Sequence, residues 1–181
     1  MFGFLFKNKK LNNIAHDLFG QIISQSREPV FYKKFSVEDS LDGRFDLMAL
    51  HMAIVIEKLN NSENQEDVLK LKQALQEIMF DNLDLTMREI GVGDMGVGKK
   101  VKAMAEAFYG RMKAYKEHLN SNNKAEMTAA LTRNLYRDRN VDGKSVDAMV
   151  AYVFEQYSHV LNQDAQKVFS GEINFFVPDD E

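Results

Sequence analysis

The chain has no cysteine, no tryptophan and only two prolines among its 181 residues. Without cysteine, disulfides, thiolate metal sites and cysteine nucleophiles are excluded, and a reducing compartment is favoured. No apolar run reaches the roughly 20 residues that a membrane-spanning helix needs. The net charge of −4 argues against general nucleic-acid binding, so no specific nucleic acid is expected as a partner.

What the chain does contain is typical of one globular domain or a closely joined pair, with 45% hydrophobic and 28% charged residues. Apolar residues recur at intervals of three and four, without sustained alternation. We therefore predict an all-α fold, a single irregular bundle of about six to eight helices over 11–172, followed by an acidic, irregular tail over 173–181. The predicted helices are 11–26, 44–60, 63–90, 97–119, 123–138 and 145–162, with short segments near 29–36 and 164–170.

Local signals refine several of these helices. The segment 44–60 is apolar almost all round, which predicts a central, buried helix. Ser62-x-x-Gln65 resembles a capping box that opens the next helix, in which a break near Asp81–Asn82 stays open. Asn123-x-x-Glu126 predicts a further helix start.

Four glycines stand close together between the helices 63–90 and 97–119, at positions 91, 93, 96 and 98. Their spacing matches part of a dinucleotide fingerprint and the start of a phosphate loop, but a helix precedes them where both motifs need a strand. Lys100 also stands where a phosphate loop needs serine or threonine. We expect no bound nucleotide. We expect Gly91 to end a helix with positive φ and the other three glycines to let the chain double back.

No catalytic residues, metal site or cofactor are predicted. The four histidines lack metal-ligand spacing, and His51, which lies among apolar neighbours, is expected to be a core residue. The serines lack a nucleophile elbow. The carboxylates near Arg88 are better explained by ion pairs than by acid–base catalysis, and Asp84 lies within reach of that arginine at i−4. We therefore expect that the chain is not an enzyme.

Charge is unevenly divided between the two central helices. Segment 63–90 holds seven acidic residues against three basic ones, whereas segment 97–119 holds six basic residues against two acidic ones. Two interpretations stay open: the helices pair their charges across a solvated seam, or the basic stripe faces a partner. The second interpretation gives a candidate partner-binding surface of Arg88, Asp94, Lys99, Lys100, Lys102, Tyr109, Arg111, Lys113 and Lys116. We expect Arg88 and Arg111 to be structural or partner-facing rather than catalytic.

The first ten residues combine apolar and basic side chains. Two interpretations are open here as well. Residues 1–10 form an amphipathic foot on a membrane, or they form a frayed end that packs on the body. The side chains that would enter the membrane are Phe2, Phe4, Leu5 and Phe6.

Two strings in the glycine-rich region, L-D-L-T-M-R-E-I-G-V-G-D-M-G-V-G-K-K-V-K at 83–102 and M-A-E-A-F-Y-G-R at 104–111, are uncommon in combination. Together with D-G-R-F-D-L at 42–47, they resemble the ubiquinol–cytochrome c chaperone family over roughly residues 28–160. The resemblance implies an all-helical domain without enzymatic activity. It also implies newly made cytochrome b as the client, a small co-chaperone and the ribosome as further partners, and a role before assembly of complex III.

The chain shows no long mitochondrial presequence, so we expect a bacterial-type member of that family. Such a protein is expected in the cytoplasm or peripherally at the inner membrane. An alternative function is a peripheral membrane protein that handles lipids or quinones through its N-terminal phenylalanines. A nucleotide-dependent enzyme is the weakest of the three hypotheses.

Overall fold

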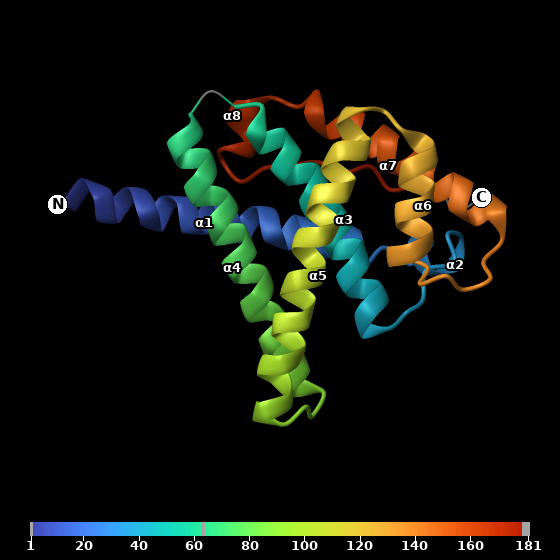
Figure 1. Ribbon diagram of the computed structural model, residues 1–181. Coiled ribbons are helices and arrows are strands. Elements are labelled where there is room, and N and C mark those ends of the chain that lie inside the picture. Colours follow the sequence, from blue (N-terminus) through green and yellow to red (C-terminus); the bar gives the residue numbers. More distant parts are fainter. Residues whose placement is uncertain (1, 63, 179–181) are drawn as a thin grey trace.

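The computed structural model describes residues 2–62 and 64–178, with side chains from Lys9 onward. In this described part the chain folds into eight helices and no strand, which confirms the all-α prediction (Figure 1). The helices are α1 (Phe2–Ser26), α2 (Pro29–Lys33), α3 (Leu41–Asn60), α4 (Gln65–Glu89), α5 (Asp94–Asn120), α6 (Lys124–Asn134), α7 (Gly143–Leu161) and α8 (Ala165–Val168). The side chains of the expected foot, Phe2, Phe4, Leu5 and Phe6, lie outside the described part, although α1 itself begins at Phe2 rather than near residue 11.

Helix α3 lies at the centre of the bundle. Every residue from Phe45 to Leu59 is buried, and α1, α4, α5 and α7 all contact this helix. Burial on every side confirms the central helix predicted from its apolar character. The helix begins where the Ser40 hydroxyl accepts a hydrogen bond from Gly43 N at 3.1 Å. Gly43 is required there, because a Cβ would lie 2.1 Å from the Glu38 carbonyl oxygen.

Helices α4 and α5 form a long antiparallel hairpin, whose closed end projects away from the rest of the bundle (Figure 1). Its turn contains Gly91, whose φ of 86° confirms the predicted left-handed conformation. The expected start of α5 near residue 97 was wrong. The helix begins at Asp94, because Gly93 provides the N-cap and Gly93 O accepts from the amides of Gly96 and Val97. Gly96 and Gly98 therefore lie inside the helix and do not reverse the chain.

Other helix ends also differ from the sequence-based expectations. Helix α4 runs without interruption through Asp81–Asn82. It is capped by Asn64, whose side chain accepts from the Asp67 amide, rather than by Ser62. The predicted cap at Asn123 is confirmed by its acceptance of the Glu126 amide at 3.1 Å.

Helix α6 ends at Asn134, earlier than the expected residue 138. Arg137 and Asp138 then adopt positive φ values of 53° and 54°. This turn in the backbone brings the Arg137 guanidinium to Asp46 on α3, with Nη2 3.0 Å from Oδ2. The end of α6 thus coincides with the change of direction that places Arg137 beside α3.

The segment after α8 is irregular, as expected, but it packs on the bundle. Ile173 is buried, and its amide donates to Gln21 Oε1 at 2.8 Å. Farther along, the Phe176 carbonyl accepts from Gln25 Nε2 at 2.8 Å. The side-chain amides of Gln21 and Gln25 on α1 thus satisfy backbone groups of this irregular segment.

The two glycines of the hairpin should respond oppositely to the same substitution. Gly91→Ala should lower the free energy of unfolding by roughly 1 kcal/mol, because its φ of 86° is unfavourable for any residue with a Cβ. Gly98→Ala should raise it by roughly 0.5–1 kcal/mol, because Gly98 is helical and a Cβ there meets no atom within 4 Å. Urea unfolding of both variants measures the difference. Equal effects would contradict the assigned conformations.

Candidate partner-binding surface

The outer face of α5 carries lysines that the packing of the helix does not use. Its inner face is closed by Val97, Phe108, Tyr115 and Leu119, all of which are buried. On the outer face four lysines are exposed, and none of them forms an ion pair within the described part of the chain. These four residues, the lysine face, are Lys99, Lys100, Lys102 and Lys113.

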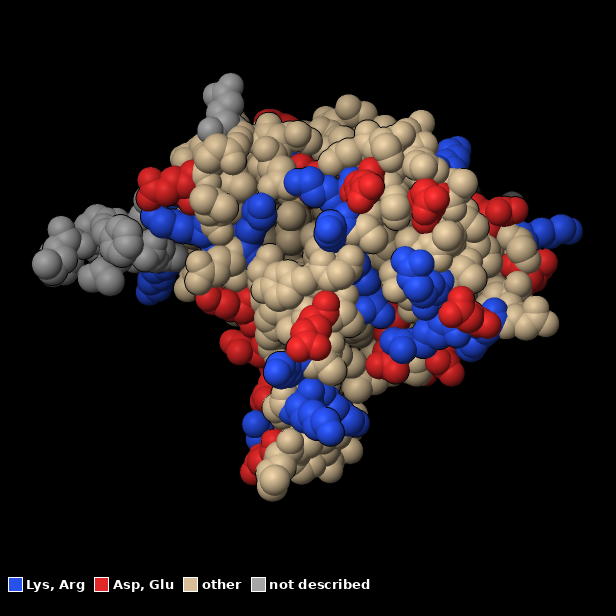
Figure 2. All heavy atoms as spheres, viewed as in Figure 1, with Lys and Arg blue, Asp and Glu red and all other residues tan. Residues whose placement is uncertain are grey.

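Figure 2 shows basic side chains gathered near the end of the projecting hairpin. The hypothesis that α4 and α5 pair their charges across a seam does not hold for the lysine face. Among the described residues, one ion pair joins the two helices, between Arg88 of α4 and Asp94 of α5. Arg88 Nε also lies 2.5 Å from Asp84 Oδ1, as expected from the i−4 spacing. Because Arg88 is half exposed, these pairs hold the turn in shape but contribute little stability.

Two other residues of the predicted partner-binding surface, Lys116 and Tyr109, lie at the edges of the lysine face. Lys116 points back toward the body, with Nζ 3.6 Å from Glu57 Oε1 on α3. Tyr109 is 53% exposed, and its hydroxyl hydrogen-bonds to Gln76 Oε1 of α4 at 3.2 Å. Its ring also packs against Phe80 of α4 at 6.3 Å between centroids. Tyr109 therefore joins the two arms of the hairpin while leaving half of its surface open to a partner.

The end of the hairpin is unusually apolar for a solvent-exposed turn. Met95 is 96% exposed and Ile90 is 60% exposed, on either side of Gly91. Both residues lie close in sequence to the lysines at 99 and 100. The turn thus combines a small apolar patch with positive charge, a combination that suits either a polypeptide or a membrane surface.

Arg111 does not belong to the exposed surface. Its side chain is 10% exposed, Nη2 lies 2.7 Å from Asp46 Oδ1, and the guanidinium sits 5.2 Å from the centroid of the Phe45 ring. Since Asp46 also pairs with Arg137, one buried carboxylate joins α3, α5 and the segment after α6. The role of Arg111 is therefore to hold the base of the hairpin.

The sequence analysis did not predict that Asp46, Arg111 and Arg137 lie together, a group named here the Asp46 cluster. The available signal was an aspartate inside the apolar run of the predicted central helix, because a buried carboxylate needs cationic partners. Burial raises the pKa of Asp46 to about 6, although Arg111 and Arg137 act to lower it. Burial also raises the pKa of the neighbouring Tyr115 hydroxyl, so that this group stays neutral.

His51 is a core residue, as predicted. It is fully buried; Nδ1 donates to the Leu47 carbonyl at 2.8 Å, and Nε2 accepts from the Tyr152 hydroxyl at 2.7 Å. Burial lowers the pKa of the imidazole to about 4, so the ring is neutral at physiological pH. His51 therefore connects α3 to α7 and is unavailable to a substrate or metal.

The described residues also bear on metal binding and on membrane crossing. No group of three or more histidine, aspartate or glutamate side chains there could hold a metal ion. None of the helices described combines the length and the apolar character that crossing a membrane requires.

Comparison with known proteins identifies relatives over most of the chain. The family described as ubiquinol-cytochrome C chaperone matches residues 33–175. Ubiquinol-cytochrome-c reductase complex assembly factor 1 of Xenopus laevis is 22% identical over 144 residues, which are 79% of this chain and 70% of that protein. The crystal structure of the Cbp3 homolog from Brucella abortus has a TM-score of 0.81 and 30% identity, over 98% of this chain and 97% of that one.

The Asp46 cluster gives a prediction with a pH dependence. Asp46→Asn should raise the free energy of unfolding at pH 7 by about 1 kcal/mol or more, because the raised pKa means that burial of the carboxylate costs more than its attraction to Arg111 and Arg137 offsets. Asp42→Asn is the matched control, and it should cost less than about 1 kcal/mol because Asp42 is 53% exposed and lies 3.5 Å from Arg137. Denaturant unfolding measures both values.

The pH dependence follows from the raised pKa of Asp46. The folded chain binds a proton near pH 6 that the unfolded chain binds only near its ordinary value of 3.8. This group therefore stabilises the native chain most below pH 4, and the stabilisation is lost as pH rises through 6. The gain in stability from Asp46→Asn should be smaller at pH 5 than at pH 7 by about 1 kcal/mol, because the native carboxyl is then largely protonated. A loss of stability in Asp46→Asn at pH 7 that shrinks on acidification would mean that the two arginines outweigh burial.

Proposed function

The chain belongs to the ubiquinol–cytochrome c chaperone family, and we propose that it is a non-enzymatic chaperone for assembly of ubiquinol–cytochrome c reductase, with newly made cytochrome b as its client. Support for the assembly role comes from the Xenopus relative, which is named as an assembly factor of that complex. The proposal also includes a small co-chaperone and the ribosome as further partners. The site of action would be the cytoplasm, or the surface of the inner membrane where the client is inserted.

The single observation that carries the proposal is the unpaired lysine face on a projecting hairpin. A buried ion pair between Arg111 and Asp46, together with the partly exposed pair between Lys116 and Glu57, attaches the base of α5 to α3 and so positions its outer lysines. Charges of this kind mainly raise the rate of association and set its salt dependence. A client that must be held and then released suits such a surface, because electrostatic attraction accelerates capture without requiring a large buried interface.

A second function, peripheral contact with a membrane, is favoured by the exposed Met95 and Ile90 beside basic residues at the hairpin turn. In that function the turn would enter the headgroup region and the lysines would contact anionic lipids. Liposome flotation of the wild-type chain and of Met95→Ser with Ile90→Ser distinguishes the two functions. Flotation that depends on these two residues would favour the membrane.

Reversing the charge of the lysine face should impair client capture without unfolding the chain. We expect the combined variant Lys99→Glu, Lys102→Glu and Lys113→Glu to reduce co-purification of cytochrome b at least tenfold, with a nearly unchanged thermal midpoint. The reduction should be larger at low salt, because the attraction of the native lysines is then least screened. Quantitative co-purification at two salt concentrations, with thermal unfolding in parallel, measures both quantities.

The matched control is the combined variant Lys33→Glu, Lys144→Glu and Lys167→Glu, which has the same charge change at three exposed lysines of α2, α7 and α8. This control should retain capture. Equal losses in the two variants would point to net charge rather than a docking surface. Unchanged capture by the first variant at every salt concentration would place client binding elsewhere.

A further inference from the structure

A groove follows the contact between α1 and α4, apart from the lysine face. Its central cavity, of about 470 Å³, is lined by residues of both helices from Asn12 to Ile23 and from Ala74 to Leu85. A second cavity of about 310 Å³ shares Asn12, Ala74 and Glu77 with it and reaches Lys70. A third, also about 310 Å³, shares Ile23 and Asn82 and reaches Ile90. Because neighbouring cavities share lining residues, the three lie end to end along α4, and this row of cavities is named here the α1–α4 groove.

The length of the α1–α4 groove matches that of an ordinary helix. From Lys70 to Ile90 it follows about 20 residues of α4, which is roughly 30 Å at 1.5 Å per residue. A helix of fifteen to twenty residues, to order of magnitude, would fill it from end to end. This shape is the one used when an amphipathic helix lies in a groove of its partner.

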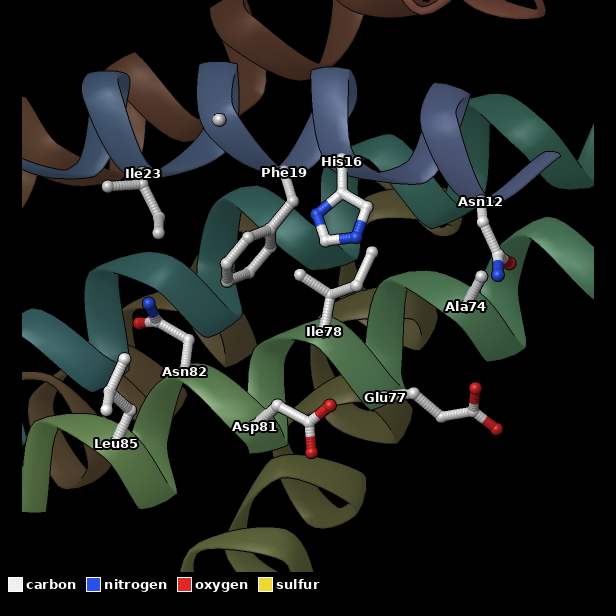
Figure 3. A pocket seen from close by; sticks show the side chains of 11 residues that line it. Asn12, His16, Phe19, Ile23, Ala74, Glu77, Ile78, Asp81, Asn82 and Leu85 are labelled. Atoms are coloured by element: carbon white, nitrogen blue, oxygen red, sulfur yellow. The ribbon is translucent and has the colours of Figure 1, made fainter. Parts of the chain in front are cut away.

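The chemistry of the groove is apolar inside and polar at its edges. Figure 3 shows Phe19 and His16 of α1 pointing toward Ile78 of α4, while Glu77 and Asp81 extend away from the α4 ribbon. Along the α4 edge Leu85 is 55% exposed and adds apolar surface to the groove. The groove therefore offers both an apolar surface and open polar side chains to a molecule lying in it.

Gly20 supports close approach of another backbone to this surface. It lies inside α1, where glycine is unfavourable by roughly 1 kcal/mol relative to alanine. A Cβ at Gly20 would meet no atom within 4 Å, so packing within the chain does not require a glycine there, in contrast to Gly43. Gly20 lines the central cavity, and the absence of a side chain there leaves room for another backbone to approach α1.

Charge is divided along the groove. Glu77 and Asp81 line its central cavity, and neither forms an ion pair within the described part of the chain; Glu77 accepts only from Gln73 Nε2, at 2.8 Å. Toward the hairpin turn, Arg27 and Arg44 line the groove, and Arg44 pairs with Asp39 at 2.7 Å. At the opposite end Lys70 pairs with Glu66 at 2.5 Å. The unpaired negative charge is thus concentrated at the centre.

We propose that the α1–α4 groove docks an amphipathic helix of a partner polypeptide. The apolar face of that helix would lie on Ile23, Ile78 and Leu85, and basic side chains at its middle would contact Glu77 and Asp81. The proposal goes beyond the assembly function, because no residue of the lysine face contributes to this site. The chain thereby has two separate surfaces of opposite charge, so that two polypeptides can be bound at once.

The test uses the full chain and a fluorescein-labelled synthetic peptide of leucine and lysine, eighteen residues or so, designed as an amphipathic helix of groove length. Fluorescence anisotropy should show saturable binding. Glu77→Lys with Asp81→Lys should weaken it at least tenfold, because the matching charges then repel. Gly20→Phe should also weaken it at least tenfold, because the ring would occupy the groove; its thermal midpoint shows that the variant is folded.

Matched controls distinguish peptide binding in the groove from nonspecific electrostatic attraction between the peptide and the chain. Gly20→Ala should bind within threefold of wild type, and Glu106→Lys with Glu117→Lys, the same charge change on exposed residues of α5, should do likewise. The variant Lys99→Glu, Lys102→Glu and Lys113→Glu should bind the peptide at least as tightly as wild type. Loss of peptide binding at the groove can therefore be distinguished from loss of client capture at the lysine face. A peptide with glutamate for lysine should bind at least tenfold more weakly.

Three outcomes would overturn the proposal. The first is wild-type affinity in folded Gly20→Phe. The second is an equal loss in the two double charge variants. The third is binding of phosphatidylcholine–phosphatidylglycerol vesicles that is abolished by Gly20→Phe, since the groove would then be a lipid surface rather than a helix site.

Discussion

The structure depends on the burial of α3 from Phe45 to Leu59. Over this length the helix has no solvent face and must satisfy each of its polar side chains inside the protein, because an unpaired buried charge costs several kcal/mol. Asp46 takes two arginines, His51 takes the Tyr152 hydroxyl, and the Lys58 ammonium donates to the Leu161 carbonyl at 2.9 Å. These bonds reach α5, α7 and the segment after α6. The polar residues of α3 thereby fix where its neighbours lie.

The projecting hairpin follows from this arrangement. Arg111 and Lys116 anchor the C-terminal half of α5 to α3, whereas the N-terminal half extends beyond the bundle with α4 as its companion (Figure 1). In that distal part the helices are held by an apolar inner face and the Arg88 pairs at the turn. The outer side chains are consequently free for a partner. A rigid base and an exposed arm give a physical basis for the client capture proposed above.

The two candidate surfaces differ in the kind of partner that each suits. The lysine face is charged and exposed on a projecting arm, so its contribution is to attraction and rate. The α1–α4 groove is concave, apolar at its base and acidic at its centre, so it suits one elongated segment in a fixed orientation. Because the two surfaces share no residue, binding at one need not displace a molecule at the other.

The sequence by itself determined the features that depend on neighbouring residues. The helical class, the buried helix at 44–60, the Asn123 cap and the positive φ of Gly91 were predicted because periodicity, capping and chirality act over a few residues. The local sequence could not show that Arg111 turns inward, that the lysine face lacks acidic partners on α4, or that α1 lies beside α4 to form a groove. Each of these depends on segments distant in the chain, and only the tertiary packing around α3 decides which side chains meet and which remain exposed.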